Sequence, residues 1–517
     1  MPELASGMLL ARGIVDRRVA ITVFRRAVTP PPVRINRRGR ERHVKRVSAS
    51  SIATTLCVSA VVLSSSSALV AQQQATPVST QAVAAAAAAQ TPAPITQTTA
   101  AHPPLPNRVN EVLPKWLRVR GEFRERIEGF DNSGFRDEND DTYYLTRVRL
   151  NATVLASKSL SFQVQAQDAR VADKTIGPNN VAPFHGTFDL RTGFADIGSA
   201  SSQVTARLGR QELSYGDQRL LGALPWTNTA RTFDAAKVTF KSKPASVDVF
   251  AASLVRILPN EFDKSGNGNR LVGAYGSIGT VIPKAVIEPY VLWHRDVNLK
   301  SELGPFGELH QYTTGARVAG KLPARLDYIV EMDKQTGSLG SDDVSAWAGH
   351  WQMRETLPGS KNVRLTGEYN YASGDNSPTD GTRSTFDQLY PTGHDKYGLT
   401  DLVGWRNVSH VRAGFEITPV NKLPVSANYH SWWLANSHDA LYAASSAVLV
   451  PRIAAGAADT HVGQELDLQV SRVISSQLSV GGGYAHIFTG GFLKQATPGK
   501  SYSYPYLMVT YVFLADK

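Results

Sequence analysis

Residues 117–128 read Leu-Arg-Val-Arg-Gly-Glu-Phe-Arg-Glu-Arg-Ile-Glu, with a charged side chain at every even position. The odd positions hold apolar residues or glycine, apart from Glu125. Successive side chains of a β-strand point to opposite faces, so this stretch predicts a strand with one charged face and one mostly apolar face. A helix would scatter both sets around its circumference.

The same two-residue alternation recurs along the chain. It is found in residues 147–154, 160–167, 326–333, 363–371, 411–417, 465–470 and 506–513. Segments of this kind suit strands that cross a bilayer at a tilt. A soluble sandwich also alternates, but it needs a second layer, and no stretch after residue 71 reads as a covering helix or a continuous buried run. The pattern therefore predicts an all-β fold, a transmembrane antiparallel β-barrel.

The basic charge of the chain is concentrated at its N-terminal end. Residues 1–50 contain twelve Lys and Arg against three acidic residues, so they carry most of the net charge of +11. The remaining sequence is nearly neutral, which argues against a nucleic-acid-binding surface. Residues 1–50 are interpreted as a basic leader, and one hypothesis places the true translation start inside it, at Val44 or Val47.

An export signal and a linker are expected next. Residues 51–71 are uncharged, apolar at first, and end in small residues, which together with the basic leader indicates a secretory signal peptide. Residues 72–114, rich in Ala, Gln, Thr and Pro, predict a disordered periplasmic linker, and the barrel is expected over 115–517. The single cysteine, Cys57, lies in the signal segment, so no disulfide or thiol chemistry is expected of the exported chain.

From Trp116 onward the chain carries several motifs in a fixed order. They are 208–213 (LGRQEL), 215–220 (YGDQRL), Trp226, 231–234 (RTFD), 371–375 (YASGD), 386–391 (FDQLYP), His394, 398–401 (GLTD), 405–407 (WRN) and 463–468 (GQELDL). In these motifs the chain resembles the alginate-export family of outer-membrane porins. The resemblance implies a monomeric barrel of eighteen strands whose bore, lined by arginines and acids, passes a polyuronate outward.

A barrel of this kind belongs in the outer membrane of a Gram-negative-type bacterium. The expected partners are outer-membrane lipid, an anionic polysaccharide, the barrel-assembly machinery and periplasmic polymer-export proteins. No nucleic acid, cofactor or metal is expected. Residues 263–268 begin like a calcium loop, but Ala274 stands where that motif needs a bidentate glutamate, and the acidic run 137–141 is interpreted as a solvated loop.

The charged face of residues 117–128 supplies the main candidate site. If the apolar face meets lipid, Arg118, Arg120, Arg124 and Arg126 point into the bore, where Arg147 and Arg149 of the next strand join them in a basic wall. The same parity sends inward Arg207, Lys237, Arg317, Arg364, Arg412, Glu331, Glu368, Glu465 and Asp467. Guanidinium groups replace part of the hydration that a carboxylated polymer loses in a narrow pore.

Three further arginines lie in the motif block, where glycines interrupt the alternation. The orientation of Arg210, Arg219 and Arg231 stays open for this reason, and all three are expected to pin a loop folded into the pore. Arg210 and Arg231 are also counted as bore residues. For any single arginine, a structural role competes with substrate binding, because large barrels hold their walls together with cross-strand Arg–carboxylate pairs.

The sequence thus predicts a passive outer-membrane channel that exports an anionic, alginate-like polysaccharide. Two alternatives stay open. One is a passive porin for the uptake of small anions or sugars, because side chains do not encode the direction of flux. The other is a barrel-embedded hydrolase: His394, His430, Ser431 and Asp439 are available, but no motif spacing singles out a nucleophile and its base.

Overall fold

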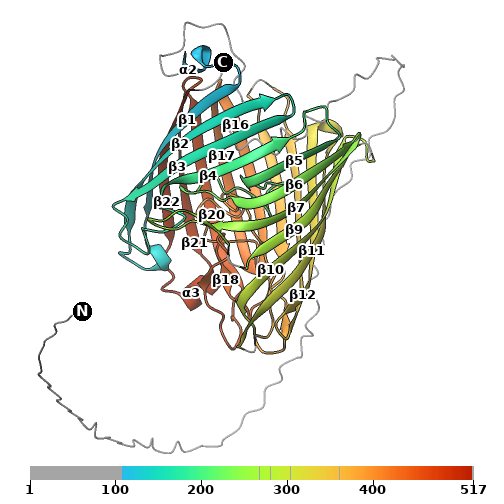
Figure 1. Ribbon diagram of the computed structural model, residues 1–517. Helices are drawn as coiled ribbons and strands as arrows, with labels where there is room; N and C mark the ends of the chain where they lie inside the picture. Colours follow the sequence, from blue (N-terminus) through green and yellow to red (C-terminus); the bar gives the residue numbers. More distant parts are fainter. Residues whose placement is uncertain (1–107, 267, 280, 303, 360, 515–517) are drawn as a thin grey trace, which may run out of the picture. The chain divides into compact units, whose positions relative to one another are not determined.

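The computed structural model describes residues 108–514 except 267, 280, 303 and 360. Eighteen long antiparallel strands close into one barrel, as the resemblance implied (Figure 1). The strands are β1 (Leu117–Phe130), β2 (Asp141–Ser157), β3 (Leu160–Ala172), β4 (Gly186–Ile197), β5 (Val204–Gln211), β6 (Phe233–Ser242), β7 (Ala245–Arg256), β9 (Arg270–Gly279), β10 (Ala285–Lys300), β11 (Phe306–Leu322), β12 (Leu326–Leu339), β13 (Asp342–Thr356), β14 (Arg364–Ala372), β16 (Val408–Val420), β17 (Leu423–Leu434), β20 (His461–Val473), β21 (Leu478–Thr489) and β22 (Tyr502–Phe513).

Several short elements lie outside these eighteen strands. They are the strands β8 (Lys264–Ser265), β15 (Thr382–Arg383), β18 (Leu441–Tyr442) and β19 (Val448–Val450), the helices α2 (Val109–Val112) and α3 (Gly491–Ala496), and the 3-10 turns η2 (Ser133–Phe135) and η3 (Pro323–Arg325). Among the described residues, no helix has the length and apolar character needed to cross a bilayer. The predicted leader and signal segment lie outside the described residues.

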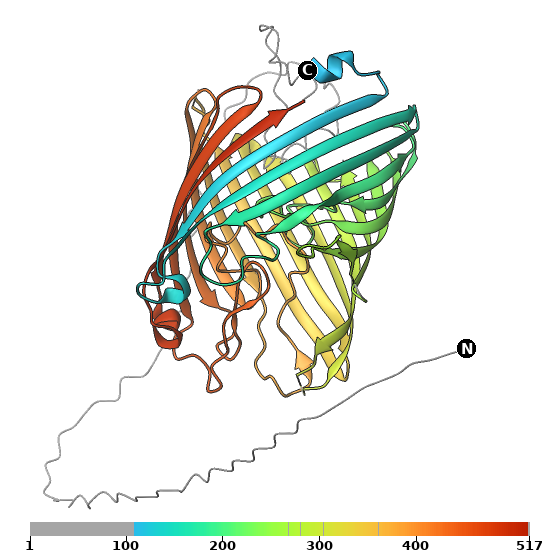
Figure 2. The same cartoon turned by 60° about the vertical axis from the view of Figure 1, so that its left-hand side comes forward.

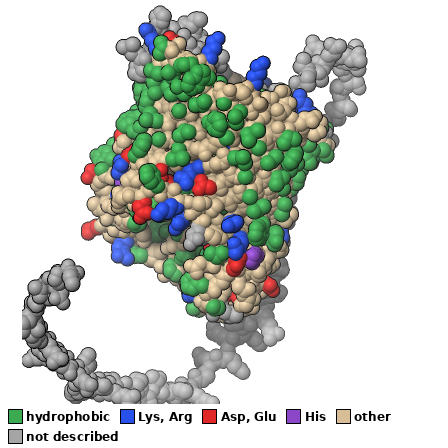
Figure 3. All heavy atoms as spheres, in the orientation of Figure 1, with side chains coloured by type: hydrophobic (Ala, Val, Ile, Leu, Met, Phe, Trp, Pro, Cys, Tyr) green, Lys and Arg blue, Asp and Glu red, His purple; other side chains and the backbone are tan. Residues whose placement is uncertain are grey.

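The alternation in the sequence has become the two faces of the barrel wall. Phe162, Val164 and Leu208 lie on the outer face and leave more than two fifths of their surface exposed. Arg147 on β2 and Glu368 on β14 occupy inward-pointing positions of their strands and are buried inside the barrel. Figure 3 shows hydrophobic side chains spread over the outer wall. An exposed apolar outer face with a polar interior is the arrangement of a membrane barrel.

The two ends of the barrel differ in their connections. Short turns such as 158–159 and 421–422 join the strands at the end where β1 begins and β22 finishes, near the top of Figure 1. The opposite end carries long connections, among them 173–185 and 435–460. Outer-membrane barrels place short turns in the periplasm and long loops outside. We therefore call these the periplasmic end and the extracellular end.

Two long connections fold back into the barrel and plug it (Figure 2). The first plug loop is 212–232, and the second plug loop is 373–407. They contribute many of the largest fully buried side chains: Leu213, Leu221, Phe386, Tyr397 and Trp405. The loops pair with each other through a parallel bridge between Leu221 and Tyr390. The hydrophobic core of this protein is therefore a filled bore.

A short helix fastens the seam where the barrel closes. β1 pairs with β22, which brings the first and last strands together. The side chain of Asn110, in α2, donates to the carbonyls of Val119 (2.7 Å) and Leu514 (2.8 Å) and accepts from the Val119 amide (2.9 Å). The end of the predicted linker, 108–114, is thus ordered. The expectation of disorder up to residue 114 is wrong there because Asn110 anchors the segment to both seam strands.

Replacing Asn110 with alanine should weaken this seam. Three hydrogen bonds are lost at about 1 kcal/mol each, so the free energy of unfolding should fall by up to about 3 kcal/mol. The measurement is the temperature at which the detergent-solubilised barrel loses its compact, fast-migrating form in electrophoresis. Asn180→Ala, in an exposed loop, is the matched control. Equal transition temperatures for the two variants would show that Asn110 does not stabilise the seam between β1 and β22.

Candidate functional site

Five of the predicted bore cations are neutralised by carboxylates on neighbouring strands. The pairs are Arg207–Asp196 (2.6 Å), Lys237–Asp248 (3.3 Å), Arg317–Glu288 (2.5 Å), Arg364–Glu416 (2.6 Å) and Arg412–Glu368 (3.4 Å). Cross-strand pairs of this kind hold barrel walls together, which is the structural role expected as the alternative to substrate binding. Binding of substrate by these five cations stays a prediction.

The basic wall of β1 and β2 has a different set of partners. Arg124 donates to the carbonyl oxygens of Pro225, Trp226 and Thr227, each at 3.0 Å. Arg126 donates to the Trp226 carbonyl (2.6 Å), and Arg147 donates to the carbonyls of Pro225 (3.1 Å) and Thr227 (3.2 Å). Three buried guanidinium groups therefore hold one turn of the first plug loop, 225–227.

Few acids balance these arginines. Glu122 pairs with Arg147 (2.6 Å), and Glu128 pairs with Arg126 (2.5 Å). Arg124 has no carboxylate partner among the ion pairs of the described residues, and its hydrogen bonds all go to neutral carbonyls. The wall thus keeps an excess of positive charge behind the plug.

Trp226 joins this wall to both plug loops. The Arg126 guanidinium lies 3.9 Å from the centre of the indole ring, and the His394 ring stacks on the same indole at 3.8 Å with an angle of 6° between the planes. Two groups so close to one ring must occupy opposite faces, so Trp226 lies between them. His394 Nδ1 in turn lies 2.9 Å from Asp401. We call Arg126, Trp226 and His394 the Trp226 sandwich.

Arg219 and Arg231 pin the plug, as the sequence analysis expected. Arg219 donates to Glu368 (2.8 Å) and to the Tyr397 hydroxyl (3.0 Å), which ties the first plug loop to β14 and to the second plug loop. Arg231 donates to the carbonyls of Gly222 (3.2 Å) and Pro391 (2.8 Å). Burial lowers the pKa of the Arg231 guanidinium to about 10, so it stays charged at neutral pH.

A half-buried carboxylate completes this network. Asp217 lies 3.2 Å from Arg219 and 3.7 Å from Lys396 of the second plug loop. Burial opposes ionisation of Asp217, but the positive charges of Lys396 and Arg219 outweigh it and hold the pKa of this carboxyl well below its usual range. The two plug loops are therefore held together by charge as well as by packing.

Arg210 does not face the bore, and its prediction as a bore residue is wrong. It shares a strand face with Leu208 on the outer wall, where it pairs with Asp234 (2.8 Å). A Cβ at Gly209 would lie only 2.3 Å from the Gly193 carbonyl oxygen, so the strand needs glycine at this close approach. The register nevertheless continues unshifted on both sides. Glycine here marks close packing of two strands and leaves the alternation intact.

The predicted acids in the bore also serve the plug. Glu465 accepts hydrogen bonds from the amide of Thr400 (3.0 Å), and Asp467 accepts one from the amide of Leu399 (3.1 Å). Glu331 accepts from the Tyr290 hydroxyl (2.7 Å). The carboxylates of β20 therefore bind the backbone of the second plug loop.

A row of histidines lies beneath the second plug loop, and of its members only His430 was considered from the sequence, as a hydrolase candidate. His350, Asn370, His410 and His430 form a continuous hydrogen-bonded chain across four strands, with steps of 2.8, 2.9 and 2.9 Å. All four are fully buried. His430 Nε2 ends the row 3.1 Å from Asp467. The available signal was their inward parity beside Glu368 and Asp467, which alternation alone supplies once the strands are placed.

The side chains considered for a hydrolase do not converge. Ser431 lies 3.4 Å from His461, whereas His430 contacts His410 and Asp467. Asp439 accepts from Tyr442 (2.9 Å) in the loop 435–460. Among the described residues, no group of three or more His, Cys, Asp or Glu side chains is arranged to hold a metal ion.

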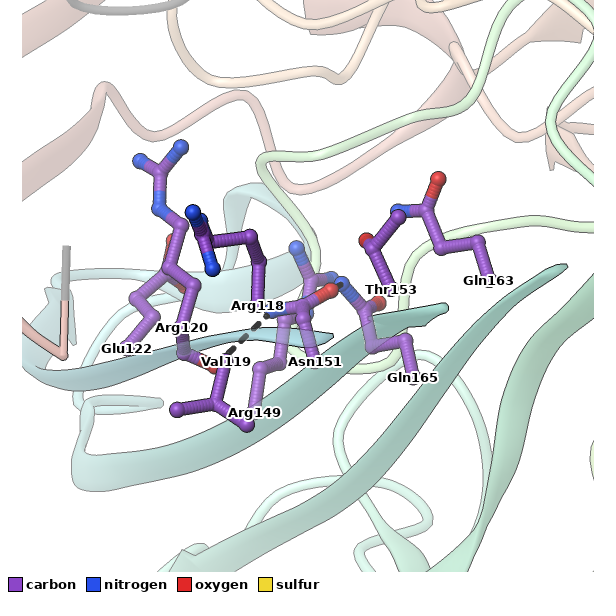
Figure 4. A pocket seen from close by; sticks show the side chains of 9 residues that line it. All are labelled: Arg118, Val119, Arg120, Glu122, Arg149, Asn151, Thr153, Gln163 and Gln165. Carbon is purple, nitrogen blue, oxygen red and sulfur yellow. Dashed lines mark hydrogen bonds between the residues drawn. The ribbon is translucent and has the colours of Figure 1, made fainter. Parts of the chain in front are cut away.

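One part of the basic wall remains open. On the periplasmic side of the first plug loop, a cavity of about 310 Å³ lies against the inner wall, as shown in Figure 4. We call it the vestibule. It is lined by Arg118, Val119, Arg120, Glu122, Arg149, Asn151, Thr153, Gln163 and Gln165. The predicted basic wall thus divides into arginines that hold the plug and arginines that border free space.

Comparison with known proteins supports both the fold and a family. The sequence profile of the alginate export family matches residues 115–506. A search of curated proteins finds no significant match. The solved structure of OccAB2 from Acinetobacter baumannii has a TM-score of 0.53 at 12% identity, covering 76% of this chain and 98% of that one.

Two channels from Pseudomonas aeruginosa show the same fold. OccK8 (OprE) matches with a TM-score of 0.52 at 11% identity, covering 77% of this chain and 98% of that one. OccK2 (OpdF), solved in complex with glucuronate, matches with a TM-score of 0.51 at 10% identity and the same coverages. At these identities the likeness concerns the fold alone.

Loss of the Trp226 sandwich should release the plug. Trp226→Ala removes a cation–π contact and a ring stack worth together about 2 kcal/mol, which corresponds to roughly a thirtyfold larger ratio of open to closed states. The measurement is single-channel conductance in planar bilayers, where longer or more frequent high-conductance events are expected. Trp347→Ala, which removes an indole from the outer wall, is the control. Unchanged gating of Trp226→Ala would show that the sandwich does not hold the plug.

Proposed function

The chain belongs to the alginate export family, and from this premise we propose that it exports a uronate-rich, alginate-like polysaccharide through an arginine-lined bore. Family and fold make it an outer-membrane channel rather than an enzyme. The finer proposal concerns the cargo and the arginines that guide it.

The main observation in support of this proposal is that Arg124, Arg126 and Arg147 all donate hydrogen bonds to carbonyls of the turn 225–227. Among the described residues, Arg124 donates only to neutral carbonyl oxygens, and the other two arginines donate to the same turn. A carboxylate binds a guanidinium more strongly than a carbonyl does, and it binds in a bidentate manner. A polyuronate that reaches this wall therefore competes with the plug for the same donors.

This competition links opening of the bore to arrival of the cargo. When the first plug loop leaves, Arg124 loses all three of its carbonyl acceptors, whereas Arg126 and Arg147 lose those on the turn but keep their carboxylate partners Glu128 and Glu122. The carboxylates of the polymer replace those acceptors along the wall. Because each contact is one of many similar ones, the polymer exchanges partners as it moves and is not trapped at one position.

A second candidate function is passive uptake of small carboxylated sugars. The observation in its favour is that a channel of the same fold, OccK2, has been solved with glucuronate bound. The same basic wall would attract such an anion. Export of polymer and uptake of monomer make different demands on the plug, because a chain needs a continuous open bore.

The open end of the basic wall should give the channel its charge preference. Replacing Arg118 and Arg120 together by glutamine removes two positive charges from the vestibule, so the preference for anions over cations should fall. The measurement is the reversal potential across a planar bilayer under a salt gradient. The control is the pair Arg170→Gln and Arg256→Gln, which removes the same charge from exposed positions away from the vestibule. The same reversal potential in both double variants would exclude the vestibule arginines from ion selection.

Experiments in cells distinguish polymer export from monomer uptake. Deleting the coding region should abolish secreted uronate polymer while leaving growth on small uronates unchanged, because the proposed cargo is the polymer. Complementation with the intact gene should restore secretion, and complementation with Arg124→Gln and Arg147→Gln together should restore less. Impaired uronate uptake with normal polymer secretion would favour the second candidate.

A further inference from the structure

The vestibule contains a buried cation with a donor to spare. Arg149 is 8% exposed, and its Nε donates to Gln167 (2.7 Å). One terminal nitrogen of its guanidinium, Nη2, is buried and has no hydrogen-bond partner among the described residues. Figure 4 places this side chain beside Asn151 and Gln165 at the cavity. A buried N–H group without an acceptor is costly, so a small turn of the Arg149 side chain toward the cavity, where a ligand supplies an acceptor, is favoured.

The charge around this donor is positive. Arg118 and Arg120 border the same cavity from β1. Neither Arg120 nor Arg149 takes part in the ion pairs found among the described residues, whereas the wall cations Arg207, Arg317 and Arg364 all do. The one acid that lines the vestibule, Glu122, is already engaged by Arg147 (2.6 Å). The cavity therefore attracts an anion, and a carboxylate matches the planar fork of a guanidinium.

Neutral amides complete the lining. Asn151, Gln163 and Gln165 reach the cavity from β2 and β3. Gln165 is held in place because it donates to Asn151 (2.6 Å) and accepts from Arg191 (2.6 Å). Amides both donate and accept, which suits the hydroxyl groups of a sugar. A site for inorganic phosphate or a simple dicarboxylate would not need this second set of groups.

Size and position narrow the occupant further. A cavity of about 310 Å³ is at the small end of the range for small-molecule sites, which suits one sugar residue and not several. It lies at the start of β1 and the end of β2, on the periplasmic side of the turn 225–227 that Arg124 and Arg147 hold. An occupant therefore arrives from the periplasmic end while the plug is closed.

From these observations we propose that the vestibule is a loading subsite that binds one uronate residue from the periplasmic side. Its carboxylate is held by Arg149 and Arg120, and its hydroxyls by Asn151, Gln163 and Gln165. This inference rests on the proposed function, which supplies a uronate chain as the cargo. It adds a defined first binding position that exists before the plug moves.

A thiol-protection experiment tests the subsite. Thr153 borders the cavity, and Thr153→Cys in a Cys57→Ser background gives the full-length chain a single thiol there. Modification of this thiol by a small water-soluble reagent is followed in purified, detergent-solubilised protein. Glucuronate should slow the modification in a concentration-dependent manner, and glucose, which lacks the carboxylate, should not. Equal protection by both sugars, or by neither, would overturn the proposal.

Substitutions assign the effect to named residues. Arg149→Gln should raise the glucuronate concentration for half-protection about tenfold, the effect expected for loss of one charge-assisted contact. Arg120→Gln should shift it in the same direction, and because Arg120 is exposed this variant tests the site even if Arg149→Gln fails to fold. Arg354→Gln, on the inner wall outside the vestibule, is the control and should behave as the parent. Equal shifts of the half-protection concentration in all three variants would show that protection depends only on the overall charge of the bore, and would overturn the assignment to Arg149 and Arg120.

Failure of the subsite and failure of the proposed function give different results. Current blocks by a uronate polymer in planar bilayers report on the conduit itself. If the polymer blocks the parent channel but Arg149→Gln and Arg120→Gln leave glucuronate protection unchanged, the loading subsite is wrong and the conduit stands. If glucuronate protects the thiol but no polymer enters the bore, the subsite stands and polymer export is wrong.

Discussion

The structure depends on one constraint, the absence of water around the backbone inside a bilayer. Each backbone N–H and C=O group at that depth must be paired within the protein, and strands achieve this only if the sheet has no free edge. Pairing of β1 with β22 removes the edge. Once the sheet is closed, side chains have only two places to point, lipid or bore, and the two-residue alternation follows from that geometry.

Closure of the sheet also leaves a wide bore, which the two plug loops fill. A barrel of eighteen strands is wider than its own inward side chains can fill. Here the first and second plug loops enter the bore from the extracellular end, and the second brings in Phe386, Tyr397 and Trp405. These buried aromatics would be out of place in an open aqueous channel. The protein has a conventional hydrophobic core, but two loops supply much of it, and polar contacts such as those of Arg124 and Arg147 with the turn 225–227 join it to the wall.

The same contrast explains what the sequence could and could not predict. Inward parity was right for Arg118 to Arg149 on β1 and β2, because alternation is a property of each strand by itself. It was also right for Glu368 and Asp467. Alternation carries no information on what fills the bore, so the sequence did not reveal that Arg124 binds the turn 225–227 or that Glu465 binds the second plug loop. Arg210 was misplaced because a glycine needed for close strand packing was taken for a break in the pattern.

If the channel exports a polyuronate as proposed, the charge distribution explains how the closed form stays ready to conduct. If carboxylates of the wall satisfied every arginine, as in the Arg364–Glu416 pair, an arriving polymer would have to break strong ion pairs to find a partner. Arg124 is held instead by neutral carbonyls of the first plug loop. This arrangement keeps the plug in place at rest, since buried guanidinium groups need acceptors, and it leaves the full charge available to an anion. On this proposal, the strong ion pairs stabilise the barrel, and the weaker carbonyl acceptors hold the plug that moves when the channel opens.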